Sequence, residues 1–103
     1  MNSKVLLVGG CGFIGHNLAI YLKNNKINPI VVDSLSINNL KSFEFKENNS
    51  DKSNQLYRAI LNNRIKLLNE NNIELIEQDT RFDNEIFDIY NKINPDIVIH
   101  LAA

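Results

Sequence analysis

Residues 8–15 of this 103-residue chain read VGGCGFIG and contain all four of its glycines, Gly9, Gly10, Gly12 and Gly15. The stretch follows a short apolar run at residues 5–8 and precedes a segment with the apolar spacing of a helix. A strand, a glycine-rich turn and a helix start, in this order, bind anions. The turn leaves room for a phosphate, and the helix directs unpaired N–H groups towards it. We therefore expect a phosphate-binding turn here.

The rest of the sequence predicts a regular alternation of strands and helices. Strands are expected at residues 4–8, 30–32, 73–77 and 97–99, and helices at residues 13–25, 53–70 and 83–91. This order requires right-handed crossovers and a parallel sheet, an α/β fold of the doubly wound Rossmann type with strand order 3-2-1-4. Residues at about 37–54 are polar and irregular, and we expect a surface excursion there.

The apolar positions of the helices predict which faces pack against the sheet. In the first helix these positions are Ile14, Leu18, Tyr21 and Leu22. In the second they are Leu56, Tyr57, Ile60, Leu61, Ile65, Leu67 and Leu68, and in the third Ile86, Phe87, Ile89 and Tyr90.

Composition and charge exclude several classes of function. The formal net charge is −1, with acidic and basic residues interleaved, so an electrostatic basis for binding nucleic acid or an anionic membrane is absent. The single cysteine, Cys11, excludes an internal disulfide and suits a reducing cytoplasm. The sequence has no transmembrane span, and its first apolar run is too short for a signal peptide. We expect a cytoplasmic protein.

Two acidic residues follow strands that should end at the same edge of the sheet. Asp33 ends the second strand and Asp79 follows the third. Ligands of open parallel sheets bind at this edge, where a carboxylate after the second strand can accept ribose hydroxyl groups. The alternatives are a turn or capping role for Asp33 and a solvated turn for Asp79. Because Asp33 would repel the 2′-phosphate of NADP and Ser34 is not basic, NAD is favoured over NADP.

Other candidate groups have no partners at useful spacing. His16 and His100 are far apart in sequence and lack metal-ligand spacing, so no metal site is predicted. We expect His16 to be a partly exposed helical residue and His100 to pack or hydrogen-bond at a strand end. Cys11 lies near a helix N-terminus, which can lower the pKa of its thiol. Without a base it is expected to be a loop residue beside the cofactor.

Four motifs in order resemble the extended short-chain dehydrogenase/reductase family, and within it the NAD-dependent nucleotide-sugar epimerases and dehydratases. They are GGCGFIG at residues 9–15, VVD at 31–33, QD at 78–79 and PDIVIHLAA at 95–103. The sequence departs from the family at Val8, which is commonly threonine, and at Ser34, which is often asparagine. The resemblance implies a nucleotide-sugar substrate for the full-length protein, which can be a homodimer.

The resemblance also implies a cofactor site built from the four glycines and nine further residues. The backbone N–H groups of Phe13 and Ile14 would hold the pyrophosphate, and Asp33, followed by Ser34, would hold the adenosine ribose. Asp79 and the Thr80 amide would contact adenine. Leu101, Ala102 and Ala103 would line the cofactor near its ribose and nicotinamide.

The family's catalytic pair is missing from these residues. By resemblance it is a tyrosine with a lysine four residues later, whereas Tyr21, Tyr57 and Tyr90 are followed at that spacing by asparagine, leucine and asparagine. We interpret the tyrosines as core residues and assign no catalytic residue. The chain is expected to be the N-terminal part of a longer enzyme, truncated after the fourth strand and without the substrate-binding part. The alternatives are a non-catalytic dinucleotide sensor and an NADP-dependent reductase.

Overall fold

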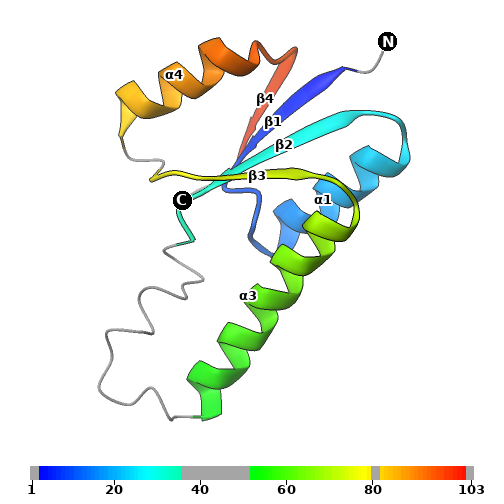
Figure 1. Ribbon diagram of the computed structural model, residues 1–103, viewed down its shortest axis with the longest axis vertical. Coiled ribbons are helices and arrows are strands. Elements are labelled where there is room, and N and C mark those ends of the chain that lie inside the picture. The colour runs from blue at the N-terminus through cyan, green and yellow to red at the C-terminus, as the bar shows by residue number, and fades with distance from the viewer. Residues whose placement is uncertain (1–2, 36–51, 80–81, 102–103) are drawn as a thin grey trace.

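The computed structural model describes residues 3–35, 52–79 and 82–101. Its elements in chain order are β1 (Lys4–Val8), α1 (Phe13–Asn24), β2 (Asn28–Asp33), α3 (Lys52–Glu70), β3 (Glu74–Glu77), α4 (Asp83–Ile93) and β4 (Ile97–His100). The four strands form one parallel sheet in the order β3-β2-β1-β4, which confirms the predicted topology (Figure 1). The expected excursion lies outside the described residues except at its end, because α3 begins at Lys52.

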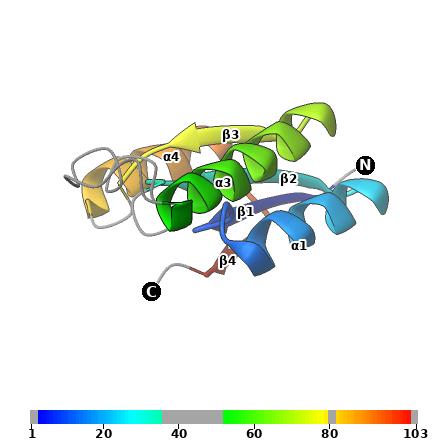
Figure 2. The ribbon, with the colours of Figure 1, turned by 90° about the horizontal axis from the view of Figure 1, so that it is seen from below.

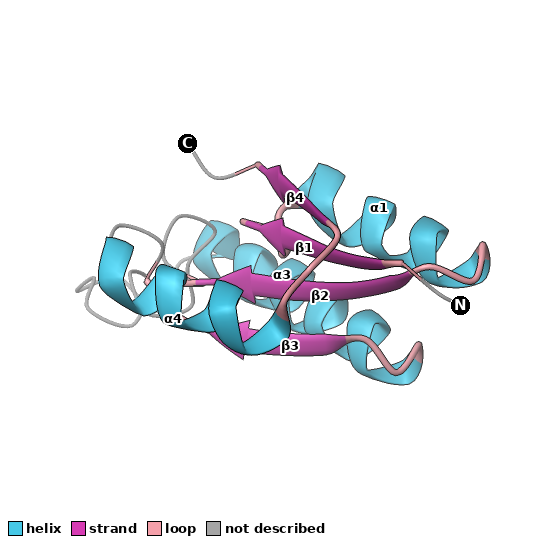
Figure 3. Cartoon of the chain, turned by 90° about the horizontal axis from the view of Figure 1, so that it is seen from above, coloured by secondary structure: helices cyan, strands magenta, loops and turns pink. Residues whose placement is uncertain are grey.

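The sheet lies between helices on both of its faces (Figure 2 and Figure 3). Side chains alternate along each strand, so Leu7 and Val31 pack in one apolar cluster with residues of α1 and α3. Leu6 and Val32 point to the other face, where isoleucines of α4 cover them. The core is therefore two apolar layers divided by the sheet and centred on β1 and β2.

Strand β2 begins before the expected Ile30 and includes a proline. The Asn28 N–H donates to the Ser3 carbonyl at 2.8 Å, on the β1 side, so position 29 faces the β3 side. Pairing with β3 starts only at Ile30, opposite Glu74. Pro29, which has no N–H, therefore removes no hydrogen bond from the sheet.

The predicted buried face of α1 is wrong in part. Ile14 and Tyr21 are 67% and 64% exposed, whereas Gly15, His16 and Ala19 are buried. A Cβ at Gly15 would lie only 2.6 Å from the preceding glycine loop. The helix therefore turns its small residues inward, and this rotation carries Ile14 and Tyr21 outward.

The first half of α3 extends past the sheet, as Figure 1 shows. Leu56 and Tyr57 are accordingly exposed, whereas Leu61 and Leu68 are fully buried. The predicted stripe thus contacts the sheet only along the second half of the helix, because the strands are shorter than the helix.

Helix α4 continues to Ile93, past its predicted end at residue 91, and is capped by the left-handed Asn94. Its isoleucines face the sheet, but the predicted aromatic residues Phe87 and Tyr90 are exposed. Among the residues that the structure describes, none of the helices has both the length and the apolar character required to cross a membrane.

Candidate functional site

Three of the four glycines are required by the geometry of the chain itself. Gly9 has a φ of 82°, a left-handed conformation that glycine adopts without strain. A Cβ at Gly10 would lie 2.8 Å from Cγ1 of Val31, and a Cβ at Gly15 would lie 2.6 Å from the Cα of Gly10. The glycines therefore allow the loop to pack tightly between β2 and the start of α1.

Gly12 differs, because its extended backbone with φ −72° and ψ 178° suits any residue. It is the N-cap of α1, where it supplies no side-chain hydrogen bond, and the first turn has no acidic residue. The helix start, with the N–H groups of Phe13 and Ile14, thus offers donors and a positive dipole end to an external anion. A glycine here also lets that anion approach the backbone closely, so these residues fit a pyrophosphate.

Asp33 connects the end of β2 to the glycine loop. Its Oδ2 accepts the Cys11 N–H at 2.8 Å and its Oδ1 accepts the Leu35 N–H at 2.8 Å. Each carboxylate oxygen has two lone pairs, so both retain acceptor capacity for a ligand. The structure therefore holds this carboxylate in one orientation beside the loop, and its binding of ribose stays a prediction.

The Cys11 side chain packs from the loop into the core, and the residue is only 2% exposed. The pKa of its thiol is raised to about 12, chiefly by burial and also by the neighbouring Asp33 charge, while Arg64 opposes the rise. The expectation that the helix start lowers this pKa is wrong, because the thiol is enclosed by the core. Cys11 is therefore protonated and unreactive at neutral pH.

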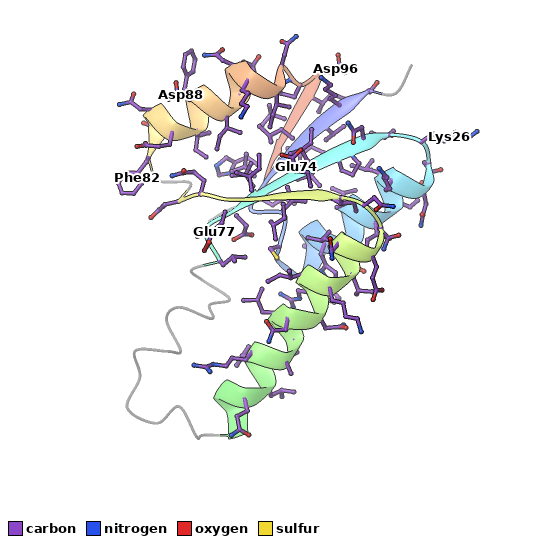
Figure 4. The ribbon with its side chains drawn as sticks, viewed as in Figure 1. Lys26, Glu74, Glu77, Phe82, Asp88 and Asp96 are labelled. Carbon is purple, nitrogen blue, oxygen red and sulfur yellow. The ribbon has the colours of Figure 1, made fainter. Side chains whose placement is uncertain are left out.

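The remaining predicted residues follow the ends of β2 and β3. Glu77 marks the carboxyl end of β3 in Figure 4, whereas Lys26 lies at the opposite edge. Glu77 is in register with Asp33, so Asp79 lies just beyond the same end of the sheet and is partly buried. Ser34 directly follows β2 and is also partly buried. The predicted residues Thr80, Ala102 and Ala103 lie outside the described part of the chain.

The end of β4 reaches the start of the glycine loop. The Leu101 N–H donates to the Val8 carbonyl at 2.7 Å, which places Leu101 beside Gly9, and its side chain is 37% exposed. His100 pairs in register with Val8 and is exposed, so it does not pack in the core.

Two side chains at the back of the loop were missed by sequence reasoning. His16 is 7% exposed, not partly exposed as expected, and its Nδ1 lies 2.9 Å from the Gly12 carbonyl oxygen. Arg64 of α3 donates to the Cys11 carbonyl at 3.5 Å. Neither belongs to a recognisable motif, because one contact depends on the rotation of α1 and the other joins residues far apart in sequence.

The three tyrosines are not part of the core. Tyr21, Tyr57 and Tyr90 are 64%, 51% and 41% exposed, so their interpretation as core residues is wrong. Among the described residues, no group of three or more histidine, cysteine or acidic side chains is placed to hold a metal ion.

A cavity of about 600 Å³ lies at the amino-terminal ends of the strands, whereas the glycine loop lies at their carboxyl ends. Its lining includes Lys4 and Asn28, the first residues of β1 and β2, and Ile89 and Lys92 of α4. This cavity shares no residue with the glycine loop.

This fold and this loop can be compared with those of known proteins. The model of the NAD dependent epimerase/dehydratase family matches residues 5–103. The chain belongs to this family. The predicted family is thereby confirmed, and the family's dependence on NAD agrees with the predicted cofactor.

Individual relatives extend over much longer chains. The chain is 30% identical over 100 residues to CDP-paratose 2-epimerase of Salmonella typhi, covering 97% of this chain and 24% of that protein. It is 37% identical over 105 residues to dTDP-D-glucose 4,6-dehydratase of Dictyostelium discoideum, covering 97% and 19%. The crystal structure of UDP-glucose 4-epimerase from Brucella ovis in complex with NAD matches with a TM-score of 0.64 and 26% identity, covering 98% and 23%. The chain thus spans about a quarter or less of these relatives.

Proposed function

We propose that this chain is the NAD-binding portion of a nucleotide-sugar epimerase or dehydratase. The observation that carries the proposal is the fixed pair of an uncapped helix start at Gly12 and a carboxylate at Asp33. Both lie at the carboxyl edge of a parallel sheet, where such folds bind dinucleotides. The names of the relatives, which are epimerases and a dehydratase of nucleotide sugars, support the substrate class.

In this proposal each group has a separate binding role. The N–H groups of Phe13 and Ile14 donate to the pyrophosphate, while Asp33 accepts hydrogen bonds from the adenosine ribose. Asp79 and Thr80 contact the adenine edge, and Ser34, Leu101, Ala102 and Ala103 complete the lining. When bound, NAD would accept a hydride from the sugar and return it, and the residues of this chain would hold and orient it.

The chain itself is proposed to bind the cofactor without turnover. Each of its three tyrosines lacks a lysine four residues later. A sugar-binding part, a homodimer and a cytoplasmic location are proposed for the whole protein. A dinucleotide sensor would bind equally well, and the two functions separate when the whole protein is assayed for hydride transfer from nucleotide sugars.

Calorimetric titration of NAD and NADP into wild type and Asp33→Asn tests the cofactor assignment. Loss of a charged acceptor for two ribose hydroxyl groups is expected to weaken NAD binding about tenfold or more. The variant should also lose much of its preference for NAD over NADP, because the carboxylate no longer repels a 2′-phosphate.

Asp96→Asn is the matched control. Asp96 Oδ2 likewise accepts a backbone N–H, from Lys4 at 2.8 Å, but at the opposite edge of the sheet. This variant should bind NAD as wild type does. Equal NAD affinity in Asp33→Asn and wild type would contradict the proposal and favour an NADP-dependent reductase.

A further inference from the structure

We propose that Arg64 and His16 are positioning residues for the glycine-rich loop. They hold the carbonyl groups of Cys11 and Gly12 on the side of the loop that faces away from the phosphates. The N–H groups that follow these carbonyls are thereby directed at the phosphates. The inference rests on the proposed function, because it takes a dinucleotide phosphate as the ligand of the loop. Neither residue contacts the cofactor in this proposal. Both act through the backbone of residues 11–13.

Arg64 provides the long-range part of this arrangement. It lies on α3, is partly buried, and donates from Nη1 to the Cys11 carbonyl at 3.5 Å, longer than the distance of about 2.7–3.2 Å typical of N–H···O hydrogen bonds. The N–H of the same residue donates to Asp33 at 2.8 Å. Cys11 is therefore held through both of its backbone groups, by α3 on one side and by the end of β2 on the other.

His16 holds the next carbonyl along the chain. Its Nδ1 lies 2.9 Å from the Gly12 oxygen, which also accepts the His16 backbone N–H at 3.1 Å. Because a carbonyl oxygen only accepts, Nδ1 must carry the hydrogen. The ring is 7% exposed, so it is enclosed and has little freedom to leave this position.

The planarity of the peptide unit explains why these carbonyls matter. In a trans peptide the C=O and the following N–H point in opposite directions. A Cys11 carbonyl that points towards Arg64 thus directs the Gly12 N–H away from Arg64. In the same way, a Gly12 carbonyl that points towards the His16 ring directs the Phe13 N–H away from that ring. In this proposal both N–H groups face the phosphates. Glycine on either side of a peptide makes a flip easy, and a flipped peptide would present oxygen to the phosphate. Two side-chain donors oppose that flip.

The cofactor-independent test is the labelling rate of Cys11, the single cysteine of the chain, with an aromatic disulfide reagent. The thiol is 2% exposed, so it reacts only when the loop opens. Arg64→Leu should raise the labelling rate about tenfold, the equivalent of one lost charged hydrogen bond. Arg64 lowers the pKa of Cys11, so its removal alone would slow thiolate chemistry. Faster labelling therefore reports loop opening, because the electrostatic effect has the opposite sign.

Arg58→Leu is the matched control for this experiment. Arg58 is a partly buried arginine earlier on the same helix, and its Nε has no hydrogen-bond partner among the described residues. It should label at the wild-type rate. Arg64→Lys, which keeps the charge and one donor, should label at an intermediate rate, and circular dichroism confirms that each variant is folded. If Arg64→Leu does not fold, Arg64→Lys and His16→Phe against Arg58→Leu decide the question.

NAD titration of the same variants separates this inference from the proposed function. Arg64→Leu and His16→Phe should each weaken NAD binding about tenfold while Arg58→Leu does not. If the wild-type chain binds no NAD, the proposed function fails and the labelling rates still test the positioning role. If the folded Arg64 and His16 variants label at the rate of wild type and Arg58→Leu, the positioning role is overturned.

Discussion

Strands β2 and β4 have nearly the same apolar sequence and very different burial. Ile30, Val31 and Val32 of β2 are 6%, 0% and 0% exposed, whereas Ile97 and Val98 of β4 are 52% and 45% exposed. Strand β2 pairs with β1 and β3 and has helices over both faces, while β4 pairs with β1 alone in the described part of the chain. Burial is thus a property of the neighbours and not of the strand's own composition.

The same contrast separates two larger units of the molecule. The β1–α1–β2 unit, residues 4–33, contains the glycine loop and most of the core. The α4–β4 unit, residues 83–100, has no buried residue in its helix and none in its strand. The same kind of substitution should therefore change the free energy of unfolding by different amounts in the two units. Within the first unit, the change should depend on whether the residue is needed for packing or for binding the cofactor.

The largest effect is expected at Gly15. An alanine Cβ there would lie 2.6 Å and 2.7 Å from backbone atoms of Gly10, so Gly15→Ala should lower the free energy of unfolding by about 3 kcal/mol. Urea unfolding followed by circular dichroism measures this change. The same substitution at Gly12, whose backbone is extended, should cost only about 1 kcal/mol or less, because alanine is a poorer N-cap than glycine, and should weaken NAD binding. Equal destabilisation by both variants would contradict this assignment of the two glycines.

The next effect compares one valine from each of these two strands. Val31→Ala should cost about 2 kcal/mol, since it removes two buried methyl groups and leaves a cavity. Val98→Ala should cost about 0.5 kcal/mol or less, because the side chain is already 45% exposed. Thermal and urea unfolding of both variants check the difference. A cost for Val98→Ala as large as that for Val31→Ala would show that β4 is covered in solution.

The smallest effect is a dependence of stability on pH through Cys11. The folded-state pKa is raised from 9.0 to about 12, so the folded state favours the neutral thiol. The stability from this group is complete below about pH 9 and is lost as the pH rises towards 12. At about pH 10 the loss should be about 1 kcal/mol.

The measurement is the difference in unfolding free energy between wild type and Cys11→Ala at neutral pH and at about pH 10. Subtracting the variant removes the contributions of lysine and tyrosine titration. The stability advantage of wild type should shrink at the higher pH. A difference that is the same at both pH values would show that the thiol titrates at its ordinary pKa.

The sequence predicts the elements and their order well because these depend on local pattern and chain handedness. The apolar runs of β1 and β2, the turn glycines and the following helix can be identified within a few residues. Right-handed crossovers limit the possible topologies, and the Rossmann rule gives the sheet order. The position of Asp33 beside the loop follows from the same rule. The rotation of a helix about its axis does not, and this is why Ile14, Tyr21 and His16 were misplaced.

The sequence by itself determined the fold and the glycine-rich turn, and its four motifs carried the resemblance to the family, because these are local signals. Only the tertiary structure decided which apolar side chains are buried, how far the pKa of Cys11 rises, and that Arg64 and His16 contact the loop carbonyls. These properties depend on groups distant in sequence, such as α3 reaching the Cys11 carbonyl. Packing brings them together, and no pattern within one segment records that contact.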